Sequence, residues 1–123
     1  MRFWAGVGAI FCFLSVGLGA FAAHALEDVL TAYGRQVWQT GIQYHQLHGL
    51  ALVSLGFLPL SDRVRPRVGS LWAAGIVIFS GSLYLLAVSG IRWLGAITPI
   101  GGICFLVGWA MLAVDLFRRR ETQ

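Results

Sequence analysis

The sequence predicts an all-α fold, a four-helix transmembrane bundle with both termini in the cytoplasm. Three observations lead to it: 58% hydrophobic and only 11% charged residues, a mean hydropathy of +0.76, and four long uncharged runs between short charged clusters. Soluble proteins carry about 25% charged residues, so the chain is predicted to lie in a membrane. The runs lack the alternating pattern of a membrane barrel, which leaves helices as the way to bond every backbone group in lipid.

The predicted helices follow the uncharged runs, and each is long enough to cross about 30 Å of hydrocarbon. The first spans residues 3–26, the second 36–61, the third 68–91 and the fourth 93–114. The connecting segments are short, and no linker or second domain is visible. The sequence therefore predicts a single transmembrane domain over residues 1–123.

A secretory signal is the alternative for the first run. Arg2 precedes the run, and Ala23-His24-Ala25 resembles a small-x-small cleavage site. The run is longer than the roughly 7–15 apolar residues of a usual signal core. We therefore expect a retained helix.

The arginines predict the orientation, because all nine basic residues are arginines and they are unevenly shared. Arg2 and the arginines of residues 63–67 and 118–120 lie on one side, whereas Arg35 and Arg92 lie on the other. The positive-inside rule then places both termini in the cytoplasm. Topology and attraction to anionic membrane lipid account for the net charge of +4, so no nucleic-acid partner is predicted.

Aromatic residues are consistent with the same orientation. Trp4 and Trp72 are expected near the inner membrane interface. Tyr33, Trp38 and Trp93 are expected near the outer one, because both interfaces are rich in tryptophan and tyrosine.

Stripes of small residues predict close helix packing. In the first helix they recur at steps of four and three residues, a spacing that lets helix backbones approach closely in lipid. The predicted packing residues are Gly8, Cys12, Ser15, Gly19, Gly81, Gly101, Cys104 and Gly108. They serve contacts within the bundle or between copies, and the two cysteines are interpreted as packing residues rather than a redox pair.

The second helix carries two polar stripes in its first half. One has four glutamines and the other two histidines: Gln36, Gln39, Gln43, Gln46; and His45, His48. Both stripes cannot face lipid. At least one is therefore expected to face other helices or a water-filled outer vestibule.

Polar residues of all four helices are expected at similar depth, as one candidate polar pocket opening outward. Its members are His24, Gln43, Tyr44, His45, His48, Ser82, Tyr84 and Thr98. Pro99 is expected to kink the fourth helix there. The residues allow two interpretations, a hydrogen-bonded network that fixes helix register and a pocket for a ligand.

Metal binding and catalysis have little support in the residues. His45 and His48 lie three residues apart and His24 is conceivable as a third ligand, but no carboxylate or cysteine lies at matching depth. All acidic residues lie at or beyond a helix end, whereas proton-coupled transporters usually keep a carboxylate inside the membrane. We therefore predict no metal, no cofactor and no catalytic residue, and a protein that is not an enzyme.

Four segments carry a resemblance to a known family. They are GAFAAHAL (Gly19–Leu26), QTGIQYHQLHGLAL (Gln39–Leu52), FSGSLYLLAVSG (Phe79–Gly90) and GAITPIGGICFLVGW (Gly95–Trp109). They closely resemble the family called domain of unknown function 423, which includes bacterial inner-membrane proteins and small eukaryotic transmembrane proteins. The resemblance implies a small multi-pass protein of the bacterial inner (plasma) membrane. It carries over no functional residue, because the family has no established activity.

Three hypotheses for function follow. The leading one is a non-enzymatic accessory or scaffold bundle that binds partner membrane proteins or lipid through its small-residue faces. The first alternative is an oligomeric pathway for a small solute or protons that uses the polar outer vestibule. In this hypothesis the protein forms a homo-oligomer. The second alternative is a redox subunit with haem, quinone or copper at the histidines.

Overall fold

The computed structural model describes residues 2–121. Its elements are α1 (Arg2–His24), α2 (Ala32–Leu55), α3 (Val64–Gly75), the π-helix η1 (Ile76–Ser80), α4 (Gly81–Ser89), the 3-10 helix η2 (Arg92–Ala96) and α5 (Thr98–Glu121). The segments α3, η1 and α4 follow one another without a break and form one long helix. The predicted all-α bundle of four helices is thus confirmed, with no strand among the described residues.

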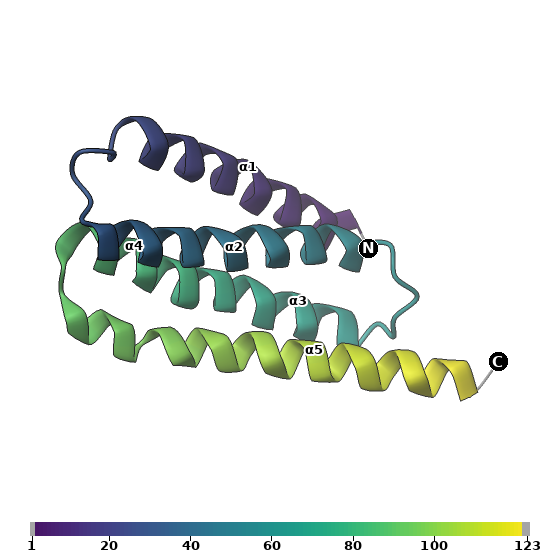
Figure 1. Ribbon diagram of the computed structural model, residues 1–123. Coiled ribbons are helices and arrows are strands. Elements are labelled where there is room, and N and C mark those ends of the chain that lie inside the picture. The colour runs from purple at the N-terminus through teal and green to yellow at the C-terminus, as the bar shows by residue number, and fades with distance from the viewer. Residues whose placement is uncertain (1, 122–123) are drawn as a thin grey trace.

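The four long helices run side by side (Figure 1). The α2 helix lies between α1 and the α3–α4 helix, and α5 packs on α3 and η1. The start of α1 and the end of α5 lie at the same end of the bundle. Both termini therefore face the same side of a membrane that the bundle crosses, and which side that is stays a prediction.

The second helix begins and ends earlier than predicted. It starts at Ala32 because the Thr31 hydroxyl accepts a hydrogen bond from Gly34 N, 3.0 Å away, and so caps the helix. It ends at Leu55 instead of residue 61 because Pro59 disfavours a helical conformation of the residue before it. The length and hydropathy of the uncharged run predict that a helix lies there. The N-terminal cap and the proline determine at which residues the helix begins and ends.

The third and fourth helices differ from the prediction at their starts, and the fourth also ends at Glu121 instead of residue 114. The α3 helix begins at Val64 and includes Pro66, since a proline in the first turn removes an N–H that has no helical partner. Pro99 is likewise the second residue of α5, after the short helix η2. The predicted kink at Pro99 is therefore wrong, because a proline in the first turn interrupts no hydrogen bond.

Two tryptophans expected at the membrane interfaces are core residues. Trp72 is 1% exposed and Trp38 is 4% exposed. Trp72 lies in the main hydrophobic cluster with Leu52, Leu55 and Val68. These two side chains therefore pack against neighbouring helices, and their depth in the membrane stays a prediction.

The small residues differ in what they contact. A Cβ atom on Gly8 would lie 2.5 Å from Val53 N and 2.6 Å from Gly49 O, so α1 approaches the backbone of α2 closely at this point. Gly101 and Gly108 lie equally close to residues of the α3–η1 helix. Gly19 and Gly81 have no atom of another element within 4 Å of a Cβ and do not make the close approach expected of them.

The remaining small residues described here are Ser15, Cys12 and Cys104. Ser15 is buried and donates to Cys12 O at 2.8 Å, so its hydroxyl is satisfied within α1. Cys12 lies against Gly49 of α2, and its thiol and that of Cys104 are free and half-buried.

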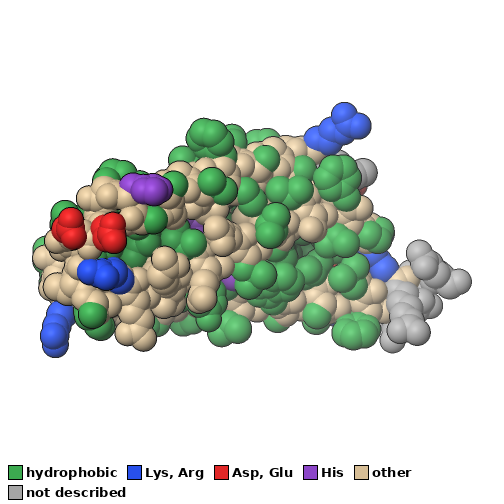
Figure 2. All heavy atoms as spheres, turned by 45° about the horizontal axis from the view of Figure 1, so that its top comes forward, with side chains coloured by type: hydrophobic (Ala, Val, Ile, Leu, Met, Phe, Trp, Pro, Cys, Tyr) green, Lys and Arg blue, Asp and Glu red, His purple; other side chains and the backbone are tan. Residues whose placement is uncertain are grey.

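Three of the helical segments are long and apolar enough to cross a membrane: Arg2–His24, Val64–Ser89 and Arg92–Arg119. The α2 helix is not among them because of its glutamines and histidines, so its crossing stays a prediction. On the face drawn in Figure 2, hydrophobic side chains cover the middle while charged ones gather toward the two ends. This distribution fits a bundle that stands in a membrane.

Arg65 ties the loop between α2 and α3 to the end of α2. It is buried, and its guanidinium donates to the carbonyl oxygens of Leu55 and Leu60. Leu55 is the last residue of α2, where a carbonyl has no partner inside the helix. An arginine that the sequence assigns to topology alone therefore also caps a helix.

We expect Gly8→Ala to destabilise the protein by about 1–3 kcal/mol, because the added methyl group meets the backbone of α2 and forces the helices apart. The measurement is the midpoint of thermal unfolding in mild detergent. Gly19→Ala is the matched control in the same helix, and we expect it to be neutral or to stabilise by up to about 1 kcal/mol, because nothing lies near the added atom and alanine favours a helix more than glycine does. Equal effects of the two substitutions would contradict this packing.

We expect Arg65→Met to cost about 1.5–3 kcal/mol, because it removes charged hydrogen-bond donors from two carbonyls and leaves them without a partner. The same unfolding midpoint reports the loss. Arg63→Met removes the same charge from an exposed residue two positions away, so its midpoint should stay at the wild-type value.

Candidate functional site

His48 is the best-enclosed polar residue of α2, with both ring nitrogens bonded. Its Nδ1 lies 2.8 Å from Tyr44 O, and Trp109 Nε1 of α5 donates to its Nε2 at 2.9 Å. A carbonyl oxygen only accepts and an indole N–H only donates, so Nδ1 carries the proton and Nε2 accepts. The ring is therefore a neutral connector between α2 and α5.

Aromatic rings surround His48 and exclude water from it. The imidazole stacks on Phe105 with ring centres 3.6 Å apart and planes 10° apart. Trp72 and Trp109 meet it edge-on at 6.1 Å and 5.8 Å. The hydrogen bonds of His48 thus lie in a dry environment, where an unpaired polar atom is costly.

His45 faces a different side of the bundle. Its Nδ1 lies 2.8 Å from the Tyr84 hydroxyl of α4, and its ring meets Phe11 of α1 edge-on. Its Nε2 is buried and has no hydrogen-bond partner among the described residues. The two histidines therefore bond to different helices and do not converge on one point.

A pair of hydroxyl groups joins α4 to the start of α5. The oxygens of Ser82 and Thr98 lie 2.6 Å apart, and Ser82 also donates to Phe79 O at 2.9 Å. Both hydroxyl groups therefore have hydrogen-bond partners within the chain.

The expected single polar pocket is divided in the structure. His45 with Tyr84, His48 with Trp109, and Ser82 with Thr98 form three separate links, and each joins two helices. Three other members are exposed: His24 at the end of α1, Gln43 on the outer face of α2, and Tyr44, whose ring covers Phe79. The helix period turns these side chains away from the core, and of the three only Tyr44 borders a hollow together with a buried member, His48.

Three residues that join helices at this site were not identified by the sequence analysis. Trp109 and Phe105 lie four residues apart on α5 and share a face, and that periodicity is a signal that could have placed them toward α2. Ser80 gave no comparable signal. Its hydroxyl is fully buried in η1 and donates to Gly41 O of α2 at 2.7 Å.

A hollow of about 390 Å³ opens beside His48, between α2 and α5. Its walls include Tyr44, Leu47, Phe79, Ile103 and Leu106, and they are almost wholly apolar. Because both nitrogens of His48 are already bonded, the hollow offers hydrocarbon contacts rather than a ligating atom. Among residues 2–121, no three histidine, cysteine, aspartate or glutamate side chains are grouped as a metal ion needs.

The exposed glutamine stripe is the main polar feature of the outer surface of α2. All four glutamines are exposed, and none of their side-chain amides makes a hydrogen bond within the described chain: Gln36, Gln39, Gln43 and Gln46. Gln46 borders a hollow shared with α1, and the neighbouring Leu47 borders the one shared with α5. The stripe therefore lies on a face of α2 that is open between α1 and α5.

Comparison with known proteins identifies relatives along nearly the whole chain. A family model described as protein of unknown function (DUF423) matches residues 18–102. The UPF0382 membrane protein YwdK of Bacillus subtilis is 47% identical, over 93% of this chain and 95% of its own length. The UPF0382 membrane protein SSP2132 of Staphylococcus saprophyticus is 44% identical, over 96% of this chain and 99% of its own length. A UPF0382 membrane protein of Haemophilus influenzae is 41% identical, over 89% of each chain. No solved structure matches.

We expect Trp109→Phe to destabilise the protein by about 1–2 kcal/mol, because it leaves the buried Nε2 of His48 without a donor. Thermal unfolding in detergent measures the loss. Trp93→Phe is the matched control, since Trp93 is largely exposed and makes no such bond. An unchanged midpoint for Trp109→Phe would show that the bond contributes nothing.

Proposed function

The chain belongs to the DUF423 family of membrane proteins, described as proteins of unknown function, and we propose from its geometry that it is a non-enzymatic scaffold or accessory subunit. In this proposal it binds the transmembrane segments of partner membrane proteins. The family resemblance of the sequence is confirmed by the match and by the relatives, and the chain is an integral membrane protein. Family membership supplies no activity, so the proposal rests on the surface of the bundle.

The exposed glutamine stripe of α2 is the observation that carries the proposal. A primary amide has two N–H donors and a carbonyl acceptor, and hydrocarbon offers no partner for any of them. From Gln36 to Gln46 the stripe extends about 15 Å along the helix axis, which is half the thickness of the hydrocarbon. Polar side chains in this position favour association with another helix that carries matching groups.

The small-residue faces are less suited to this role than the sequence alone indicated. Gly8, Gly101 and Gly108 lie against other helices of the same chain, so their surfaces are not free for a partner. Gly19 has open space beside it, but a single glycine gives no recognition. We therefore assign partner binding to the glutamine face rather than to the small-residue stripes.

The energetics suit a reversible association. Hydrogen bonds between transmembrane helices contribute on average about 0.6 kcal/mol each and at most about 1.7 kcal/mol. Four amides together supply a few kcal/mol and fix the register of the partner helix. Packing of Leu47 and Leu50, which are exposed beside the stripe, would add van der Waals contact.

A solute pathway is the second candidate, and the same stripe favours it. If several copies met around their glutamine faces, the amides would line a polar channel instead of a helix interface. The buried histidines do not extend such a path within one chain, because His45 bonds toward α4 and His48 toward α5, and the two rings do not converge. Flux through proteoliposomes that contain the purified protein distinguishes a channel from a scaffold.

We expect replacement of Gln39 and Gln43 by leucine to weaken partner binding by about 1–3 kcal/mol, which corresponds to roughly 5- to 150-fold, through the loss of two amides. A photo-reactive residue placed at Leu47 would report binding in native membranes as a protein adduct of defined mass. The adduct should fall in the double variant while the unfolding midpoint stays constant, since both side chains are exposed.

The same photo-reactive residue at Leu85, exposed on α4, is the matched control and should give lipid adducts only. Equal protein adducts with and without the two glutamines would refute the proposal. So would an absence of protein adducts at Leu47.

A further inference from the structure

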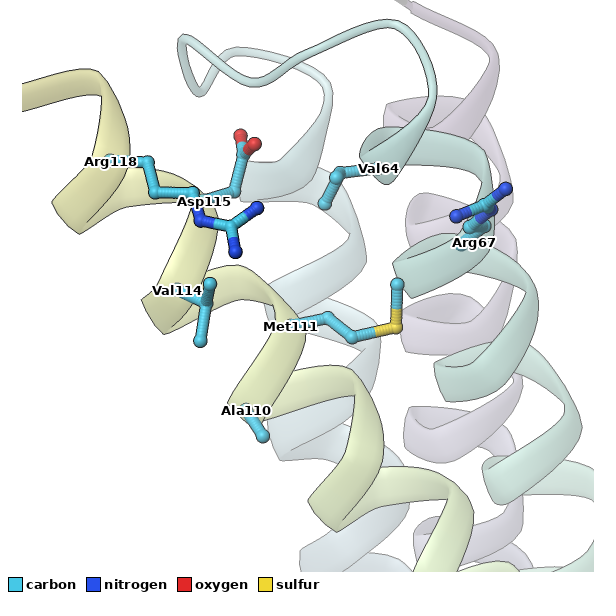
Figure 3. A pocket seen from close by; sticks show the side chains of 7 residues that line it. All are labelled: Val64, Arg67, Ala110, Met111, Val114, Asp115 and Arg118. Atoms are coloured by element: carbon cyan, nitrogen blue, oxygen red, sulfur yellow. The ribbon is translucent and has the colours of Figure 1, made fainter. Parts of the chain in front are cut away.

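A groove of about 330 Å³ lies between the start of α3 and the last turns of α5 (Figure 3). Arg67 of α3 and Arg118 of α5 stand on its two sides. Val64 of α3 and Ala110, Met111 and Val114 of α5 line most of the rest, and the surface of the groove is overwhelmingly apolar. It thus combines two guanidinium groups with a hydrocarbon-like floor.

The carboxylate in the groove is already engaged. Asp115 Oδ2 accepts a hydrogen bond from Ser61 N at 3.1 Å and pairs with Arg119 Nε at 3.3 Å. Arg67 and Arg118 are exposed, and neither pairs with a carboxylate within the described part of the chain. Two positive charges therefore remain available to an anion.

The groove is polar at one end and apolar at the other. Ala110 lies eight residues before Arg118, which is about 12 Å along the axis of α5. The arginine end belongs to the end of the bundle that holds both termini, and Ala110 lies deeper, toward the middle. A phospholipid has the same order of parts, a phosphate at the interface and acyl chains below it.

We propose that this groove binds one anionic phospholipid, with its phosphate between Arg67 and Arg118 and an acyl chain along Ala110, Met111 and Val114. Guanidinium groups match phosphate oxygens in geometry and form charge-assisted hydrogen bonds with them. Basic pockets between transmembrane helices select anionic headgroups in this way. The site is separate from the glutamine face of α2, so either proposal can fail without the other.

The predicted orientation supports the choice of lipid over other anions. Both termini, and with them the groove, are predicted on the cytoplasmic side, where the leaflet is rich in anionic lipid. The apolar floor is open to the surrounding membrane, because Ala110 and Val114 are exposed side chains. A soluble phosphate compound would gain nothing from that floor.

Native mass spectrometry of the full chain in mild detergent tests the proposal with two probes, phosphatidylglycerol and phosphatidylcholine with identical acyl chains. We expect the wild type to retain phosphatidylglycerol preferentially. The double variant Arg67→Gln and Arg118→Gln should lose this preference by about 30-fold, as two arginines near a membrane surface allow. The matched control, Arg35→Gln and Arg92→Gln, removes the same charge at the opposite end and should keep it.

A second variant tests the acyl-chain part of the groove. Ala110→Trp fills the apolar floor from an exposed position and leaves both arginines in place, so retention of phosphatidylglycerol should also fall while the unfolding midpoint holds. Wild-type retention in the arginine double variant would overturn the proposal, and so would an equal loss in the Arg35 and Arg92 control. If the groove variants instead lose a co-purifying protein and keep the lipid, the groove binds protein and the proposal is wrong.

Discussion

Hydrocarbon offers no hydrogen-bond partner, and this constraint acts most strongly on α2, the most polar of the four helices. Both of its histidines bond to other helices of the same chain, although the buried Nε2 of His45 has no partner among the described residues. His48 accepts from Trp109 of α5, and His45 bonds to the Tyr84 hydroxyl of α4. Because these partners lie on different helices, α2 is held at the centre of the bundle and its rotation is fixed.

Close backbone approach makes these bonds possible. At Gly8 the backbone of α1 meets that of α2, and at Gly101 the backbone of α5 meets η1. Ser80, in the π-helical turn, reaches the backbone of Gly41 at 2.7 Å. A π-helical segment shifts the faces of the residues after it, and here it lies where the α3–α4 helix meets both α2 and α5.

The same constraint separates structural polar residues from those available for binding. The histidines, Ser80 and the pair Ser82–Thr98 are bonded inside the bundle and stabilise it. The glutamine amides find no partner there, which makes their face a candidate for contact with another protein. At the end of the bundle that holds the termini, Asp115 pairs with Arg119, whereas Arg67 and Arg118 pair with no carboxylate of the described chain, and a lipid phosphate suits them. The molecule thus offers an amide surface and a cationic surface on different parts of the bundle.

The sequence by itself determined the helical class, the membrane location, the approximate extent of the four helices and the family. These depend on hydropathy, run length and local motifs, which are properties of the chain alone. The sequence also separated the two polar stripes of α2 by their helical period. Helical periodicity shows which residues share a face, but it does not show which other helix packs against that face.

Only the tertiary structure decided that the histidine stripe is inside and the glutamine stripe outside. It also placed Trp38 and Trp72 in the core and Pro99 in a first helical turn rather than at a kink. The physical reason is that these outcomes depend on neighbours distant in sequence, as with Trp109 and His48, which are 61 residues apart. No local pattern encodes which side chain on one helix will meet an imidazole on another.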